Sequence, residues 1–249
     1  MARGAVLVVL LQGALGGVTV LFRLPLAVSV THACLAQAFL CLVMALAVCT
    51  APGWQEGRRR PAPTQSRQGL RPAPTQSFQR PASWVEQQQP ALRVLAAITV
   101  GVVYLQLILG ALMRHMGAGL SIPDFPLAFG RLVPPLESPA VVVHFVHRLG
   151  AVAAALCVGW TAARIFSRYR AERRLLRPAL LLVGLVLLQL TLGALTIWTR
   201  RAVLPMTAHV AVGAAVLATS VVVMLHAARL IVAPAGMAGQ DFLSAQVTA

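Results

Sequence analysis

Six long apolar runs limit what this chain can fold into. They cover residues 5–22, 26–49, 92–113, 141–165, 178–198 and 204–229. Each is close to the roughly 20 residues that a helix needs to cross the hydrocarbon core of a bilayer. The chain is 58% hydrophobic and only 11% charged, which lies outside the range of ordinary soluble domains. The sequence therefore predicts an all-α integral membrane protein with six transmembrane helices.

The charged residues of the chain indicate how these helices are oriented. All 21 basic residues are arginine, against six acidic residues, which gives a formal net charge of +15. Most of the arginines flank the runs within residues 50–93 and 164–177, and no soluble basic domain remains to bind a nucleic acid. The positive-inside rule places both segments in the cytoplasm. We therefore predict cytoplasmic termini and no nucleic-acid partner.

Residues 51–91 are rich in Pro, Gln and Arg, and repeat the heptapeptide RPAPTQS at 60–66 and 71–77. Such a segment cannot bury a core, so we predict a disordered cytoplasmic linker. Attraction to anionic lipid headgroups is an alternative role, and a tolerated insertion is the favoured one. The linker separates a helix pair within residues 1–50 from a four-helix unit at 92–232, and residues 233–249 form a tail.

A repeat relates the first helix pair to the last. Residues 11–19, LQGALGGVT, match residues 188–196, LQLTLGALT, and a weaker echo, LQLILGA, occurs at 105–111. The glutamine of each full copy lies 20 residues before a histidine, His32 or His209. Such repeats mark duplicated membrane bundles. We therefore expect residues 1–50 to be half of a second bundle, in a chain that lacks the first two helices of an eight-helix architecture.

The chemistry is expected at the start of the run 141–165, where residues 144–148 read HFVHR. Ionisable groups within membrane helices are costly and are functional candidates. A haem in a four-helix bundle needs two axial imidazoles from facing helices at similar depth. His147 and His209 meet this requirement, so we predict that they ligate a haem iron. Thr207 is a candidate acceptor for the second ring nitrogen of His209.

Several neighbouring residues have alternative interpretations. His144 competes with His147 as the ligand, because it lies on the same helix face one turn nearer the membrane surface. Arg148 would contact a haem propionate or extend to the membrane surface. His32 would border a second haem or be vestigial. The Gly- and Pro-rich segment 110–130 carries Arg114, His115 and Asp124, for which propionate contacts and loop packing are equally plausible.

Three elements together resemble the haem A synthase family of cytochrome oxidase assembly proteins. They are the segment GALMRHMGAGLSIPDFP at residues 110–126, the pair His147-Arg148, and the LQxxxG…His pattern of the first and last helix pairs. The resemblance covers nearly all of the chain except the linker. It implies two four-helix bundles, with a haem b bound in the C-terminal one by His147 and His209.

The same resemblance implies an activity, a location and partners. The N-terminal bundle would handle haem O, the substrate, whose methyl group is oxidised to the formyl of haem A in oxygen-dependent steps. The protein would lie in the inner (plasma) membrane of a bacterium, with membrane lipid around it. Haem O synthase or cytochrome oxidase assembly factors would be its partners.

Two departures from the family pattern argue against full catalytic competence. The N-terminal helix with the family's carboxylate and His-Arg pair is missing, and Ile122 and Ala128 occupy positions where some members have a cysteine pair. The catalytic residues stay unassigned, and whether the chain is an enzyme is left open. A b-type cytochrome that relays electrons is the alternative. A transporter ranks last, because only four scattered glutamines interrupt the helices: Gln12, Gln37, Gln106 and Gln189.

Overall fold

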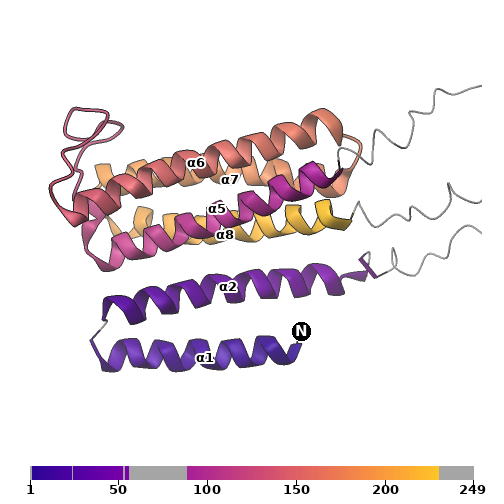
Figure 1. Cartoon of the computed structure of the whole chain (residues 1–249), viewed down its shortest axis with the longest axis horizontal. Helices are drawn as coiled ribbons and strands as arrows, with labels where there is room; N and C mark the ends of the chain where they lie inside the picture. The colour runs from indigo at the N-terminus through magenta and orange to yellow at the C-terminus, as the bar shows by residue number, and fades with distance from the viewer. Residues whose placement is uncertain (1, 24, 53, 56–88, 230–249) are drawn as a thin grey trace, which may run out of the picture.

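The computed structural model describes residues 2–23, 25–52, 54–55 and 89–229, and it is built from long helices (Figure 1). These are α1 (Ala2–Leu21), α2 (Leu26–Thr50), α5 (Gln89–His115), α6 (Pro139–Arg168), α7 (Arg173–Trp198) and α8 (Val203–Arg229). All six are long and apolar enough to cross a membrane, which confirms the predicted all-α membrane fold. Most of the predicted linker and the whole predicted tail lie outside the described residues.

The helices extend beyond the predicted apolar runs. Helix α6 begins at Pro139, because Ser138 caps it by accepting a hydrogen bond from the Val141 N–H at 3.3 Å. Helix α7 begins at Arg173 rather than Pro178, and the Glu172 carboxylate accepts from the Arg174 N–H at 3.2 Å. A hydropathy pattern detects only the apolar part of a helix, so the polar turns at its ends are missed.

Helices α5 to α8 form a four-helix bundle. Contacts run from α5 to α6, from α6 to α7, from α7 to α8 and from α8 back to α5, so α6 and α8 lie on a diagonal. Helix α2 packs against α5 and α8, and α1 packs against α2 (Figure 1). The Tyr104 hydroxyl on α5 donates to the Cys34 carbonyl on α2 at 2.9 Å, which ties this outer pair to the bundle.

The two ends of the helices differ in what they carry. One end, which we call the loop end, holds the α1–α2 turn, the α7–α8 turn and the long α5–α6 loop of residues 116–138 (Figure 1). The other, which we call the linker end, holds the end of α2 at Thr50 and the start of α5 at Gln89. Both the first residue of α1 and the last residue of α8 also lie at the linker end (Figure 1).

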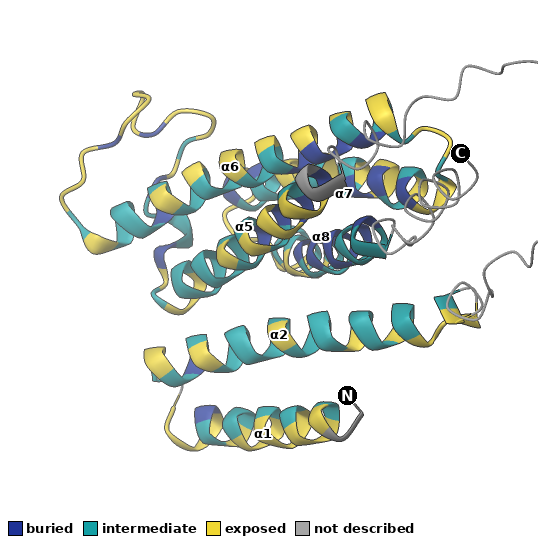
Figure 2. Cartoon of the chain, turned by 45° about the vertical axis from the view of Figure 1, so that its right-hand side comes forward, coloured by how far each residue is buried: buried dark blue, intermediate teal, exposed yellow. Residues whose placement is uncertain are grey.

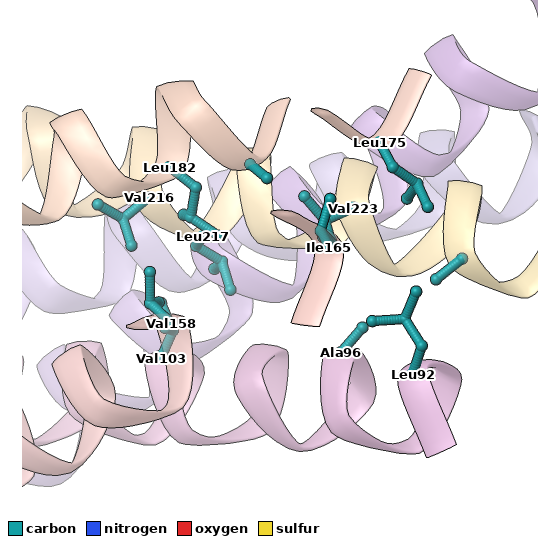
Figure 3. Packing of buried hydrophobic residues seen from close by; sticks show 12 residues of the cluster. Leu92, Ala96, Val103, Val158, Ile165, Leu175, Leu182, Val216, Leu217 and Val223 are labelled. Atoms are coloured by element: carbon teal, nitrogen blue, oxygen red, sulfur yellow. The ribbon is translucent and has the colours of Figure 1, made fainter. Parts of the chain in front are cut away.

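The closely packed core lies in the linker half of the four-helix bundle. Figure 2 shows the buried residues gathered on the facing sides of α5 to α8. The cluster ends at Val103 on α5, Val158 on α6, Leu182 on α7 and Val216 on α8 (Figure 3). Among the described residues, Val103, one residue past the middle of α5, is the only cluster member in the loop half of these helices.

We expect Leu217→Ala to destabilise the bundle by about 2–5 kcal/mol, because it removes a fully buried side chain and leaves a cavity. Leu187→Ala on α7 is the matched control, since Leu187 is 62% exposed. Reversible unfolding in mixed micelles measures both changes. Equal losses in the two variants would contradict this location of the core.

Candidate functional site

His147 on α6 faces Gln106 on the neighbouring helix α5. The Gln106 amide nitrogen lies 3.1 Å from His147 Nδ1 and donates to the His147 backbone carbonyl at 2.9 Å. The His147 side chain is half-buried and lies about two turns inside the loop end of α6. One side-chain amide therefore contacts both the ring and the backbone of this histidine.

His209 on α8 has the same relation to Gln189 on α7. The Gln189 amide nitrogen lies 3.2 Å from His209 Nε2. His209 Nδ1 lies 3.1 Å from the Gln189 backbone carbonyl, to which only an N–H can donate. The Nδ1–H tautomer follows, with Nε2 accepting from the amide. The prediction that Thr207 accepts from the second ring nitrogen of His209 is wrong. Thr207 is exposed, and the Gln189 backbone carbonyl accepts from His209 Nδ1 instead.

A third copy of this contact joins α1 and α2. The Gln12 amide nitrogen lies 3.4 Å from His32 Nε2 and donates to the His32 carbonyl at 3.2 Å. His32 Nδ1 is buried and has no hydrogen-bond partner. His32 therefore has the same local surroundings as the two bundle histidines, on a helix pair outside the four-helix bundle.

Each imidazole lies against a glycine one turn after the glutamine. A Cβ placed on Gly16, Gly110 or Gly193 would come within 3.0, 3.1 and 3.2 Å of the Cε1 atom of the facing histidine. Such separations are shorter than an ordinary van der Waals contact, so a side chain here would push the ring aside. The three glycines make room for the three rings.

The two bundle histidines lie on helices that are not neighbours. Helices α6 and α8 lie on the diagonal of the bundle. Both histidines lie at the loop end, beyond the closely packed core. The His209 Nδ1–H donates to a backbone carbonyl, as the second ring nitrogen of metal-ligating histidines usually does, and this leaves the lone pair on Nε2.

This donor set suits a haem better than a metal ion held by side chains alone. No group of three or more His, Cys, Asp or Glu side chains that could hold an ion occurs in the described part of the chain. A porphyrin supplies four nitrogens itself, so two opposed imidazoles complete the coordination of its iron. His147 and His209 fit that requirement.

His144 and Arg148 hold the α5–α6 loop against α6. His144 is only 2% exposed, and its two ring nitrogens lie 3.2 Å from the Ile122 N–H and 3.3 Å from Arg148 Nε. The Arg148 guanidinium donates to three loop carbonyls, those of Ile122, Asp124 and Leu127, at 3.2, 2.7 and 2.8 Å. Both residues proposed as candidates from sequence therefore contact loop backbone, while His147 faces α5.

The loop is further ordered by Asp124 and by contacts with the α7–α8 turn. The Asp124 carboxylate accepts from the Phe129 and Gly130 N–H groups at 2.7 and 2.8 Å, and these bonds hold its pKa below the usual value. Phe125 packs edge-on against Trp198 at 6.1 Å. Arg114 and His115 are exposed at the end of α5, near the loop but outside this network.

The glutamines are the site residues that the sequence interpretation missed. Gln12, Gln106 and Gln189 were expected to be scattered polar residues, yet each lies against a histidine. The signal was the LQxxxG pattern, which recurs before all three histidines. In the middle copy, the α5–α6 loop lengthens the Gln–His separation from 20 to 41 residues, which hides the relation.

Fold and site together define an integral membrane protein with two imidazoles in the loop half of a four-helix bundle, each held by a glutamine of a neighbouring helix. The model of the COX15-CtaA family, described as "Cytochrome oxidase assembly protein", matches residues 1–221, so the chain belongs to this family. This bears out the resemblance found in the sequence.

Individual relatives carry the name "Heme A synthase". The protein of Symbiobacterium thermophilum is 37% identical over 175 residues, which is 68% of this chain and 49% of the relative. Those of Granulibacter bethesdensis and a Caulobacter species are 34% and 39% identical, over 55% and 49% of this chain and 38% of each relative. The chain thus spans about half the length, or less, of these curated relatives.

We expect Gly110→Val and Gly193→Val to displace the facing imidazoles and to lower haem binding at least about 10-fold, the range seen when the support of a metal ligand is lost. Gly101→Val in α5 and Gly184→Val in α7 are matched controls, because a Cβ at either position meets no atom within 4 Å. Haem titration followed by absorbance measures each affinity. Equal losses in the control variants would show that β-branching, and not the ring contact, is responsible.

The order of the α5–α6 loop should depend on the ionisation of Asp124. Its folded-state pKa is lowered, so its stabilising effect is complete above the usual value of 3.8 and is lost as the pH falls through the lower folded-state value. Amide hydrogen-exchange protection factors of Phe129 and Gly130 should therefore fall on acidification from pH 6 to pH 3. Asp124→Asn should remove this pH dependence and Glu137→Gln should keep it, whereas pH-independent protection in the unmodified protein would contradict it.

Proposed function

We propose that this protein binds a haem b between α6 and α8 through His147 and His209, and that it acts in haem A biosynthesis for cytochrome oxidase assembly. The reaction would oxidise the methyl group of haem O to the formyl of haem A. The observation that carries the proposal is the pair of imidazoles in the loop half of diagonal helices, each held by a glutamine of a neighbouring helix, in a chain of the cytochrome oxidase assembly family. The relatives named "Heme A synthase" support the assigned reaction.

In this proposal the residues of the chain bind and enclose the haem. His147 and His209 supply the axial nitrogens, and Gly110 and Gly193 leave room for the rings. The α5–α6 loop, held down by Arg148, limits the access of water to the loop end. When bound, the haem would supply reversible one-electron chemistry.

An electron-relay role for the four-helix bundle is the second candidate, and the ligand set itself favours it. A haem with two imidazole ligands has no open position for oxygen, so it suits electron transfer. The oxidation of haem O would then require another site. His32 is the candidate residue for bordering it, because its surroundings repeat those of His147 and His209.

We also propose that the linker end faces the cytoplasm of a bacterial cell. A cavity of about 210 Å³ opens there between α7 and α8, lined by Arg173, Arg174, Arg177, Pro178, Val222 and His226. Arginines at this level can reach the phosphates of lipid headgroups. The cavity lies at the opposite end of the bundle from the paired imidazoles. It therefore suits contact with membrane lipid. The protein partners, haem O synthase or cytochrome oxidase assembly factors, stay predictions from the family resemblance.

Replacing either axial histidine should abolish haem binding. We expect the purified protein to show the absorption spectrum of a low-spin, bis-histidine haem, and His147→Ala and His209→Ala to lose it. His115→Ala and His226→Ala should keep it, since His115 is exposed and His226 packs against Trp54 at the linker end. An unchanged spectrum in both ligand variants would overturn the site.

Conversion of haem O to haem A, assayed with the same samples, separates the two functions. Conversion of haem O by the unmodified protein supports the assigned reaction. A bound haem without any turnover supports the electron relay.

A further inference from the structure

We propose that the Gln106 side chain is a positioning residue for the haem ligand His147, and that the Gln189 side chain is not one for His209. Among the described residues, Gln106 is the only side chain that pairs with His147 Nδ1, and its amide nitrogen lies nearer to Nδ1, at 3.1 Å, than to Nε2, at 3.5 Å. The Gln189 amide nitrogen instead lies against Nε2 of His209, at 3.2 Å. The proposal rests on His147 and His209 being the axial ligands. It also states which groups determine the position of the ring proton in the imidazoles of His147 and His209, and how strongly each imidazole donates electrons.

His209 does not need the Gln189 side chain to be held in its ligating tautomer. Its Nδ1–H donates to the Gln189 backbone carbonyl at 3.1 Å, and a substitution of the side chain leaves that carbonyl in place. The Gln189 amide instead donates to Nε2 at 3.2 Å, the nitrogen that must carry a free lone pair toward iron. The amide therefore competes with iron for the same atom.

His147 has the opposite arrangement. Its Nδ1 lies 3.1 Å from the Gln106 side-chain nitrogen, and no backbone carbonyl pairs with this ring among the described residues. Ligation through Nε2 moves the ring proton to Nδ1, which then requires an acceptor. A half-turn of the Gln106 amide exchanges its NH2 and C=O groups and provides one, in exchange for the hydrogen bond that the amide donates to the His147 backbone carbonyl.

The glutamine oxygens are suited to such a turn. The Oε1 atoms of Gln106 and Gln189 are buried and have no hydrogen-bond partner. Gln106 Oε1 occupies the space beside Gly150 where any other residue would carry its Cβ. A buried amide oxygen without a donor is costly in an apolar medium, so accepting the His147 Nδ1–H would offset the loss of the amide's hydrogen bond to the His147 carbonyl.

The test compares haem binding and redox behaviour in three matched variants. Gln106→Leu, Gln189→Leu and Gln37→Leu each remove one membrane amide, and Gln37 is the control because no hydrogen bond joins it to a histidine in the described structure. We expect Gln106→Leu to weaken haem binding about 10- to 100-fold and to raise the midpoint potential, because His147 becomes a weaker electron donor. Gln189→Leu should bind haem at least as tightly as the unmodified protein, with an unchanged potential.

Gln106→Glu separates positioning from packing. A Glu side chain keeps an acceptor oxygen of similar size, so it should restore haem affinity and lower the midpoint potential relative to Gln106→Leu. The inference is overturned if Gln106→Leu and Gln189→Leu behave alike, or if Gln106→Leu behaves like Gln37→Leu. Failure of the unmodified protein to bind haem through two histidines would instead overturn the proposed function, so the two failures are distinguishable.

Discussion

An imidazole inside a membrane helix must find its hydrogen bonds within the protein, and this requirement organises the molecule. Leaving a polar group unsatisfied in hydrocarbon costs roughly several kcal/mol. Each histidine that faces a neighbouring helix here, His32, His147 and His209, contacts a glutamine of that helix. A glycine one turn further along lets the two helices approach closely enough for the contact. The polar pair thereby fixes the register of the two helices.

The two halves of the bundle have different tasks. The linker half is closely packed around residues such as Ile165 and Leu217, and it holds the four helices together. The loop half carries the histidines, and its closure depends on Arg148, which binds three backbone carbonyls of the α5–α6 loop. The closely packed core and the two imidazoles are therefore separated along the helix axes, so the surroundings of the rings can vary with little effect on the core.

Much of this arrangement could be predicted from sequence because hydropathy, arginine placement and the LQxxxG repeat are local patterns. They gave the six helices and identified His147 and His209 as a pair. The partners of the histidines depend on helix register, which no local pattern fixes, so the Gln106 contact was missed and Thr207 was wrongly chosen. Arg148 binds backbone carbonyls of the loop. Every residue has a carbonyl, so the amino-acid sequence does not show which ones lie within reach.

The glutamine–histidine–glycine contact needs only two antiparallel helices, and not the segment that joins them. In the middle copy 41 residues separate glutamine from histidine, against 20 in the other two, and the contact is nevertheless retained. The hairpin is thus a self-contained unit of inheritance. Such a hairpin can be duplicated, fused or given a longer connection. Each copy then contains its own histidine together with the glutamine and glycine that position it.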